Sequence, residues 1–181
     1  AALAWATFVA FATKLIACTL QQKAIGELLG NSLSVRSAVG LNTTVVKAIR
    51  LILEEKGMTV AKVCTLVGGP DWPTSVLAGI LKQDIFSMLL GTAPILIPIA
   101  FTVCAGGFLL KVPDGGSWTA LSSCFLTLSA LTLGGSLIVA GVFIENVSNK
   151  RAAEIAAIAD DERVKEYDRV ENVKQVMRDE V

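Results

Sequence analysis

The chain has 181 residues, of which 53% are hydrophobic and 18% charged, and its mean hydropathy is +0.62. This composition excludes an ordinary soluble domain and indicates an integral membrane protein. Residues 145–181 hold ten acidic and seven basic side chains, whereas residues 1–144 hold six acidic and nine basic ones. We therefore predict a membrane domain over residues 1–148 and a solvent-exposed, charged helical tail over residues 149–181, with no basic patch for nucleic acid.

The first predicted membrane span covers residues 1–22, which are apolar except for Lys14 and the polar residues at the end. At a rise of about 1.5 Å per residue, this segment is long enough to cross a hydrocarbon core of about 30 Å. A lysine within a span either extends its ammonium group to the membrane interface or binds an ion or substrate. Both interpretations of Lys14 remain open.

Two short amphipathic helices are predicted next, near residues 44–56 and 59–67. Asn42 and Thr43 are residues that favour the N-cap position of the first of them. Its apolar side chains recur at helical spacing, while Lys47 and Arg50 fall on the opposite side. We expect this helix to lie on the membrane surface or against the spans, with the basic side chains facing outward.

The sequence Gly-Gly-Pro-Asp-Trp-Pro then predicts a loop followed by a short helix, together covering residues 68–83. Asp71 is the predicted N-cap, and Pro73 fits the first turn because an N–H group is not needed there. The helix is too short to span a membrane, so it either re-enters the membrane partway or lies along its surface. Irregular backbone enters a membrane only when protein covers it or when it lines a water-filled cavity.

The second span is predicted at residues 85–110 and the third at residues 115–144. A turn from Lys111 to Asp114 connects them. Both segments lack charged residues. In the second, Gly91, Pro94 and Pro98 predict a kink, because each proline removes a backbone donor and crowds the preceding turn. In the third, two pairs of small residues four apart predict surfaces for close helix packing: Ala130 with Gly134, and Ser136 with Ala140.

The charged tail carries a weakly apolar side at Val164, Tyr167 and Val170, which we expect to dock a protein partner.

Three spans place the loop over residues 23–82 and the tail on the same side of the membrane. Seven Lys or Arg residues occur in that loop and seven in the tail, against Lys111 alone in the opposite loop. The positive-inside rule therefore predicts a C-terminus on the cytosolic, stromal or matrix side.

The sequence carries little that points to catalysis. It contains no histidine, the commonest general base and metal ligand. Its four cysteines lie far apart in apolar surroundings and are predicted to be reduced. We therefore expect no enzyme activity, no catalytic residue, no metal and no required cofactor. Lipid, chlorophyll or carotenoid bound at subunit interfaces is the open alternative, with weak candidate ligands at Trp72, Gln83, Phe86, Phe101, Trp118 and Asn146.

Across residues 68–110, the order of prolines, glycines and Phe86 follows a recognisable pattern, through Pro70, Pro73, Gly79, Phe86, Gly91, Pro94 and Gly106. This quarter of the chain resembles the second half of the SNARE-associated Golgi family, whose members are also called VTT-domain membrane proteins. It is also similar to uncharacterised algal membrane proteins that carry the same segment. The resemblance implies a multi-pass helical protein linked to lipid movement or transport.

Our first functional hypothesis is a non-enzymatic accessory subunit of a large organellar membrane complex, with other membrane subunits and lipids as partners. A photosystem in the thylakoid or plastid is favoured, with an endomembrane or the mitochondrial inner membrane as alternatives. The second hypothesis is a small VTT-like transporter or lipid scramblase. A third is a membrane tether with a coiled-coil tail, although the heptads of the tail are irregular. A cavity at the membrane midplane would favour the second hypothesis, and solid packing or a pigment there would favour the first.

Overall fold

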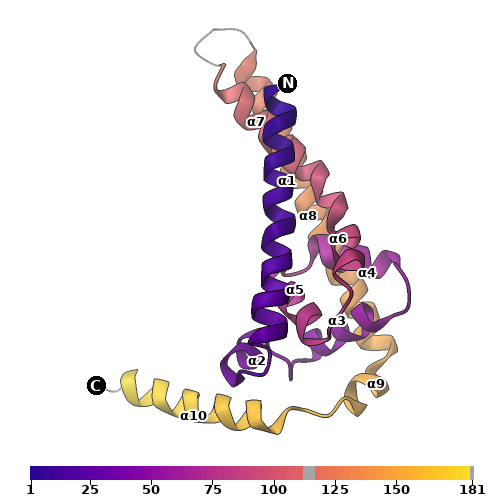
Figure 1. Ribbon diagram of the computed structural model, residues 1–181, viewed down its shortest axis with the longest axis vertical. Helices are drawn as coiled ribbons and strands as arrows, with labels where there is room; N and C mark the ends of the chain where they lie inside the picture. The colour runs from indigo at the N-terminus through magenta and orange to yellow at the C-terminus, as the bar shows by residue number, and fades with distance from the viewer. Residues whose placement is uncertain (112–116, 180–181) are drawn as a thin grey trace.

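The computed structural model of the chain describes residues 1–111 and 117–179, and all regular secondary structure in these ranges is helical. Three of the described stretches are long and apolar enough to cross a membrane: Ala2–Leu28, Ile85–Leu109 and Trp118–Lys150. The protein is thus an all-α integral membrane protein with short additional helices and a charged C-terminal helix, as the sequence predicts (Figure 1).

The first span consists of α1, Ala2–Leu20, and the π-helix η1, Gln21–Leu28. It therefore runs past the predicted end at residue 22. The side chains of Lys23 and Glu27, one turn apart, form an ion pair of 2.8 Å along this extension. Gln22 is completely buried, and its side-chain amide donates to the carbonyl oxygen of Gln83 at 2.7 Å. Tertiary contacts, rather than apolar composition, thus extend the helix beyond its hydrophobic part.

The second span is interrupted. It consists of α6, Ile85–Thr92, the 3-10 turn η2, Ala93–Ile95, and α7, Leu96–Leu109. The third span is the single helix α8, Trp118–Lys150, which continues past the predicted end at residue 144. Residues 112–116 lie outside the described residues. They include most of the predicted turn at 111–114 and the predicted start of the third span at residue 115.

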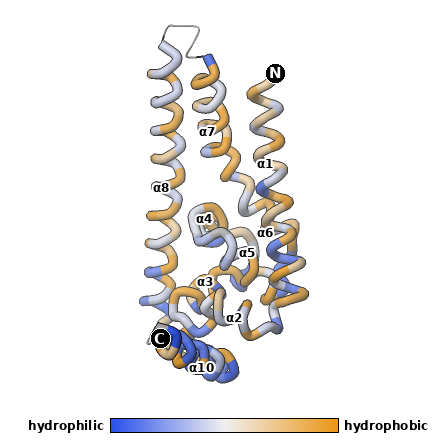
Figure 2. The backbone as a smooth tube through the Cα atoms, turned by 90° about the vertical axis from the view of Figure 1, so that its left-hand side faces the viewer, coloured by the Kyte–Doolittle hydropathy of each residue, from blue (hydrophilic) through white to orange (hydrophobic). Residues whose placement is uncertain are grey.

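Three helices precede the second span at one end of the molecule: α3, Thr44–Glu54, α4, Val60–Gly68, and α5, Asp71–Ile80. The side-chain oxygen of Thr43 caps α3 by accepting from the N–H of Val46. Helices α4 and α5 form a hairpin, which lies between α8 and the first span (Figure 2). The residue at the N-cap of α5 is Pro70, and Asp71 is the first residue of the helix, so the predicted cap at Asp71 is wrong by one position.

The remaining short helices are α2, Leu33–Val39, α9, Ala152–Ala157, and α10, Glu162–Asp179. Figure 1 shows α10 lying crosswise at the end of the long helices, where it contacts α2. The core of this end is formed by buried apolar side chains of α3 and α5, among them Ile49, Ile52, Val76 and Leu77. All four cysteines are free thiols, as predicted, at positions 18, 64, 104 and 124.

The expected outward position of Lys47 is wrong. Lys47 is only 8% exposed, because the segment that joins α9 to α10 covers this side of α3. The ammonium group donates to the carbonyl oxygen of Ile158 at 2.8 Å and to the carboxylate of Asp160. Helical periodicity alone placed Lys47 on a solvent face, but the tail folds back over that face and satisfies the charge.

Candidate functional site

The tip of the hairpin between α4 and α5 meets the middle of α8. A Cβ atom added to Gly68 would lie 2.1 Å from the backbone oxygen of Ser136, so the two backbones are in direct contact. Ser136 precedes Glu145, the first charged residue of α8, by nine residues. This separation is about 13 Å at about 1.5 Å per residue, close to half of a hydrocarbon core of about 30 Å. The hairpin tip therefore lies against the apolar part of α8, near the middle of that helix.

A second glycine contact fixes the returning helix of the hairpin. A Cβ atom added to Gly79 of α5 would lie 2.2 Å from the carbonyl oxygen of Gln22 and 2.7 Å from the Cα atom of Gly26. Because neither Gly79 nor Gly26 has a side chain, α5 lies directly against η1. The hairpin is thus held between two spans by backbone contact at both of its arms.

Two buried hydroxyl groups of the hairpin have no hydrogen-bond partner among the described residues. They belong to Thr65 in α4 and Thr74 in α5, and both side chains are almost fully buried. A buried hydroxyl without a partner costs about 1–3 kcal/mol. The interior of the hairpin therefore holds two hydroxyl groups that can still form hydrogen bonds. The sequence pattern did not single out either threonine.

The predicted kink lies beside the hairpin tip. Pro94 sits within η2, and Pro98 begins the part of α7 that faces α8. The carbonyl oxygen of Pro98 accepts from the hydroxyl of Thr102 at 2.9 Å and from that of Ser129 at 3.2 Å. Gly91 is buried, and a Cβ atom there would meet the side chain of Leu66 at 2.5 Å. The break in the second span is therefore anchored by α8 on one side and by the hairpin on the other.

The face of α8 that holds this region together is a row of three serines, of which the sequence analysis named only Ser136. Ser122, Ser129 and Ser136 recur every seven residues, which places them on one side of the helix. The hydroxyl of Ser122 donates to the carbonyl oxygen of Ala105 at 2.8 Å. The hydroxyl of Ser129 lies 2.7 Å from that of Thr102. The seven-residue spacing was the available signal.

The two predicted packing pairs of α8 differ in position. Ser136 contacts Gly68, and Ala140 is 1% exposed, so this pair packs against the rest of the chain. Ala130 is exposed, and a Cβ atom at Gly134 would meet no atom within 4 Å. Ala130 therefore faces away from the other described helices, whereas Gly134 borders an open cavity together with Gly68 and Gly69.

One open cavity lies at the hairpin tip, and a second lies next to it, between the three spans. The first has a volume of about 360 Å³ and is bordered by Gly68, Gly69 and Gly134. The second has a volume of about 260 Å³ and is bordered by Lys14, Pro98 and Thr102. Ile95 and Leu133 border both cavities, so the two are neighbours on either side of the same pair of side chains.

No family model, curated protein or solved structure matches this chain. The resemblance to VTT-domain proteins therefore stays a prediction, and function has to be argued from the geometry of the site.

Lys14 brings a positive charge to the second cavity. It precedes Lys23, the next charged residue, by nine residues, so it lies at about the same depth as Ser136, about 13 Å from the charged end of its span. Its side chain is half-buried and borders a cavity that is otherwise apolar except for Thr102. This position favours the interpretation of Lys14 as a binding group.

The six weak candidates for a cofactor site are not brought together. Phe101 and Trp118 belong to one aromatic cluster with Phe125 and Phe108, whose ring centroids are 5.3 Å apart. Phe86, Trp72 and Asn146 are exposed on other parts of the molecule. Gln83 uses its backbone oxygen to accept from Gln22, far in sequence from the aromatic cluster. The described side chains thus provide no shared pigment or cofactor pocket among these residues.

The predicted partner surface of the tail also needs correction. Val164 is 1% exposed, and the hydroxyl of Tyr167 lies 3.0 Å from that of Ser34 in α2. Both residues dock the tail onto its own chain, because α10 folds back across α2. Of the three predicted docking residues, Val170 alone is exposed, at 49%.

Proposed function

We propose that this chain is a membrane transport module in which the re-entrant hairpin tip and the break in the second span form a path for an amphiphilic solute or lipid. The observation that carries the proposal is the pair of neighbouring cavities at the depth of Ser136 and Lys14. The first volume, about 360 Å³, lies just above the lower end of the range of about 300–1,000 Å³ found for ligand sites, and the second, about 260 Å³, lies just below it. This geometry supports the VTT-like alternative over a solidly packed accessory subunit.

The polar groups at this depth explain how such a path would lower the barrier to crossing. A polar headgroup in hydrocarbon loses its hydrogen bonds to water, which costs several kcal/mol per group. Lys14 and Thr102 supply a charge and a hydroxyl group next to the second cavity. The positive charge favours an anionic substrate, such as a lipid with a phosphate group, over a cationic one.

The proposal is tested by reconstituting the purified chain into liposomes and measuring exchange of a fluorescent phospholipid between leaflets. We expect faster exchange than in protein-free liposomes, and a loss of most of the increase in Lys14→Met. Lys23→Met is the matched control, since Lys23 is exposed near the end of the same span. Exchange at the protein-free rate would contradict the transport function.

Insertion separates a functional role of Lys14 from a structural one. A lysine at mid-membrane costs about 2.5–3.5 kcal/mol on insertion scales. Lys14→Met is therefore expected to insert at least as well as the unmodified chain while it transports less. Poorer insertion of Lys14→Met would indicate that the lysine supports the fold instead.

We propose as a second candidate that the chain is also an accessory subunit of a larger organellar complex, with the thylakoid favoured. The small residues Ala130, which is exposed, and Gly134, where an added Cβ atom meets no atom within 4 Å, support this, because small residues let a partner helix approach closely. Substituting both by Leu should release the chain from such a complex during mild detergent extraction of its native membrane. Docking of α10 on α2 supports a common side for the loop and the tail, which the positive-inside rule places in the cytosol, stroma or matrix.

A further inference from the structure

A separate cavity lies at the charged end of the molecule, where the tail crosses the short helices. Its volume is about 300 Å³, and it lies between α2, α3, α5 and the segment 158–161. Three basic residues, Arg36, Lys47 and Arg50, border one part of it. The other part is apolar and comes mainly from the end of α5, at Leu77, Ile80 and Leu81. The cavity therefore combines a cationic part and an apolar part, as an anionic amphiphile would need.

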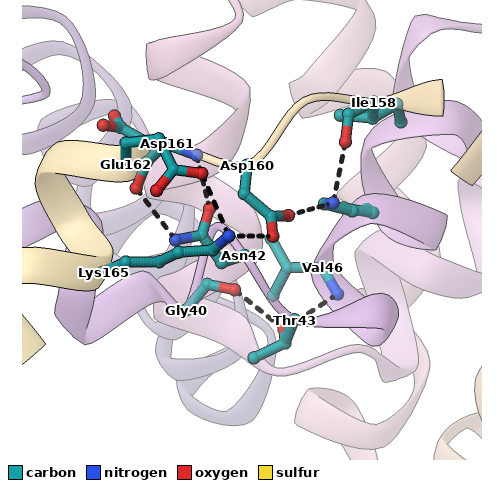
Figure 3. Close-up of polar contacts among 10 residues, drawn as sticks. Gly40, Asn42, Thr43, Val46, Ile158, Asp160, Asp161, Glu162 and Lys165 are labelled. Carbon is teal, nitrogen blue, oxygen red and sulfur yellow. Dashed lines mark hydrogen bonds and ion pairs between the residues drawn. The ribbon is translucent and has the colours of Figure 1, made fainter. Parts of the chain in front are cut away.

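The tail places two carboxylates on these cations. Asp160 forms an ion pair with Lys47, and Asp161 forms one with Arg36. Asn42 fixes the same segment, because its amide donates to the carbonyl oxygen of Asp161 at 3.1 Å and accepts from the N–H of Asp161 at 2.8 Å (Figure 3). Lys165 lies 2.8 Å from Asp160 and is part of the tail itself.

The positive charges that the tail neutralises, on Arg36 and Lys47, belong to α2 and α3. Without residues 158–165, the cavity keeps Arg36, Lys47 and Arg50, of which Arg50 pairs with Glu54 at 2.9 Å. A net charge of +2 then remains beside the apolar part of the cavity. The tail is what buries Lys47, so when the tail leaves, the ammonium group becomes accessible to water or to another anion.

Phosphate suits these cations as well as a carboxylate does. The guanidinium of Arg36 presents several donors in a fixed plane that matches phosphate oxygens, and Lys47 adds a point charge. The cavity also lies near the end of α8, since Lys47 and Asp160 border a neighbouring cavity together with Ser148. Ser148 follows Glu145, the first charged residue of α8, so the cavity lies beside the charged end of this span.

We propose that this cavity binds the phosphate group of an anionic phospholipid, with the apolar part of the lipid against Leu77 and Ile80, and that Asp160 and Asp161 of the tail compete with the lipid for Arg36 and Lys47. The tail thereby acts as a cover that a lipid displaces. The inference stands on this cavity and does not depend on transport through the midspan cavities.

The proposal is tested by measuring lipid retention and tail position in nanodiscs. The full chain is placed in phosphatidylcholine with or without phosphatidic acid, and bound lipid is measured by native mass spectrometry. Spin labels at Ala38 and Val170, both exposed, report the distance between α2 and α10. We expect phosphatidic acid to be retained and the distance to increase when it is present.

Variants separate competition from general loss of structure. At about 1 kcal/mol per basic residue at an anionic surface, freeing two cations should tighten retention roughly thirtyfold in Asp160→Asn with Asp161→Asn. Glu166→Gln, an exposed change on the same tail, should leave retention unchanged. Arg36→Gln with Lys47→Gln should abolish retention, whereas the charge-conserving pair Arg36→Lys with Lys47→Arg should keep most of it.

Several outcomes would overturn the proposal. Equal retention of phosphatidic acid and phosphatidylcholine would do so, as would unchanged retention in Arg36→Gln with Lys47→Gln. Displacement of the tail by inorganic phosphate alone, in phosphatidylcholine nanodiscs, would show that a free anion and not a lipid is the ligand.

Discussion

Replacing Gly68 with alanine should push α4 away from α8. The added Cβ atom would lie 2.1 Å from the oxygen and 2.3 Å from the carbon of the Ser136 carbonyl group, and 2.8 Å from the nitrogen of Leu137. All three are backbone atoms, so no side chain can rotate to make room. Ordinary contacts lie at about 3.5–4.0 Å, which means that the hairpin must move by more than about 1 Å.

The size of the effect follows from two opposing terms. Overpacking in a close contact costs about 1–3 kcal/mol. Alanine regains at most about 1 kcal/mol over glycine through helix propensity, and less at Gly68 because it is the last residue of α4. We therefore expect a net loss of about 1–2 kcal/mol in the free energy of unfolding.

Gly134→Ala and Gly141→Ala are the matched controls. Both glycines lie in α8, and an added Cβ atom at either meets no atom within 4 Å. They should be neutral or slightly stabilising. Reversible unfolding in mixed micelles, followed by circular dichroism, measures all three variants. Equal stability of Gly68→Ala and Gly134→Ala would refute the backbone contact at the hairpin tip.

Three further predictions concern the kink, the tail and the topology. Pro94→Ala with Pro98→Ala should restore the missing helical hydrogen bonds and reduce transport without reducing insertion, as measured by lipid exchange and protease protection; normal transport would make the kink incidental. Hydrogen bonds from Lys165 and Lys47 lower the pKa of Asp160 to about 2. Since the unfolded value is near 3.9, this contact should hold the tail fully above about pH 4 and lose its contribution as the pH falls through about 2. Spin-label distances between α2 and α10 check this, and release of the tail near neutral pH would contradict it. Single cysteines at Ser34 and Lys165 should react with an impermeant reagent from the same side of the membrane; reaction from opposite sides would overturn the three-span topology.

The sequence predicted those parts of the molecule whose physics is local. Long runs without charged residues predict the spans, because a helix that crosses the hydrocarbon core of a membrane needs about 20 consecutive, mostly apolar residues. Pro94 and Pro98 mark the break in the second span, since proline lacks the backbone donor. The pattern around Gly68 and Pro70 left two arrangements open, and the contact between Gly68 and Ser136 favours the re-entrant one, which stays a prediction.

The parts that the sequence did not predict depend on contacts between distant segments. Lys47 falls on the polar side of α3 by periodicity, yet Asp160, more than a hundred residues later, covers it. Val164 follows a weakly apolar pattern that is equally suitable for a partner or for the chain itself, and it packs on the chain. The position of Lys14 beside a cavity depends on how α1 packs against α7, which local pattern does not determine.

The most direct test of the central claim is the accessibility of the midspan cavities to water-soluble molecules. Both leucines of α8 are partly exposed, Leu133 at 45% and Leu131 at 66%, but Leu133 borders both cavities and Leu131 borders neither. Single cysteines are placed at each position in a background without native cysteines, and the reconstituted protein is treated with a charged thiol reagent. A polar path to the midplane predicts that the cysteine at position 133 reacts and that the one at position 131 does not. Equal protection of both positions would contradict it.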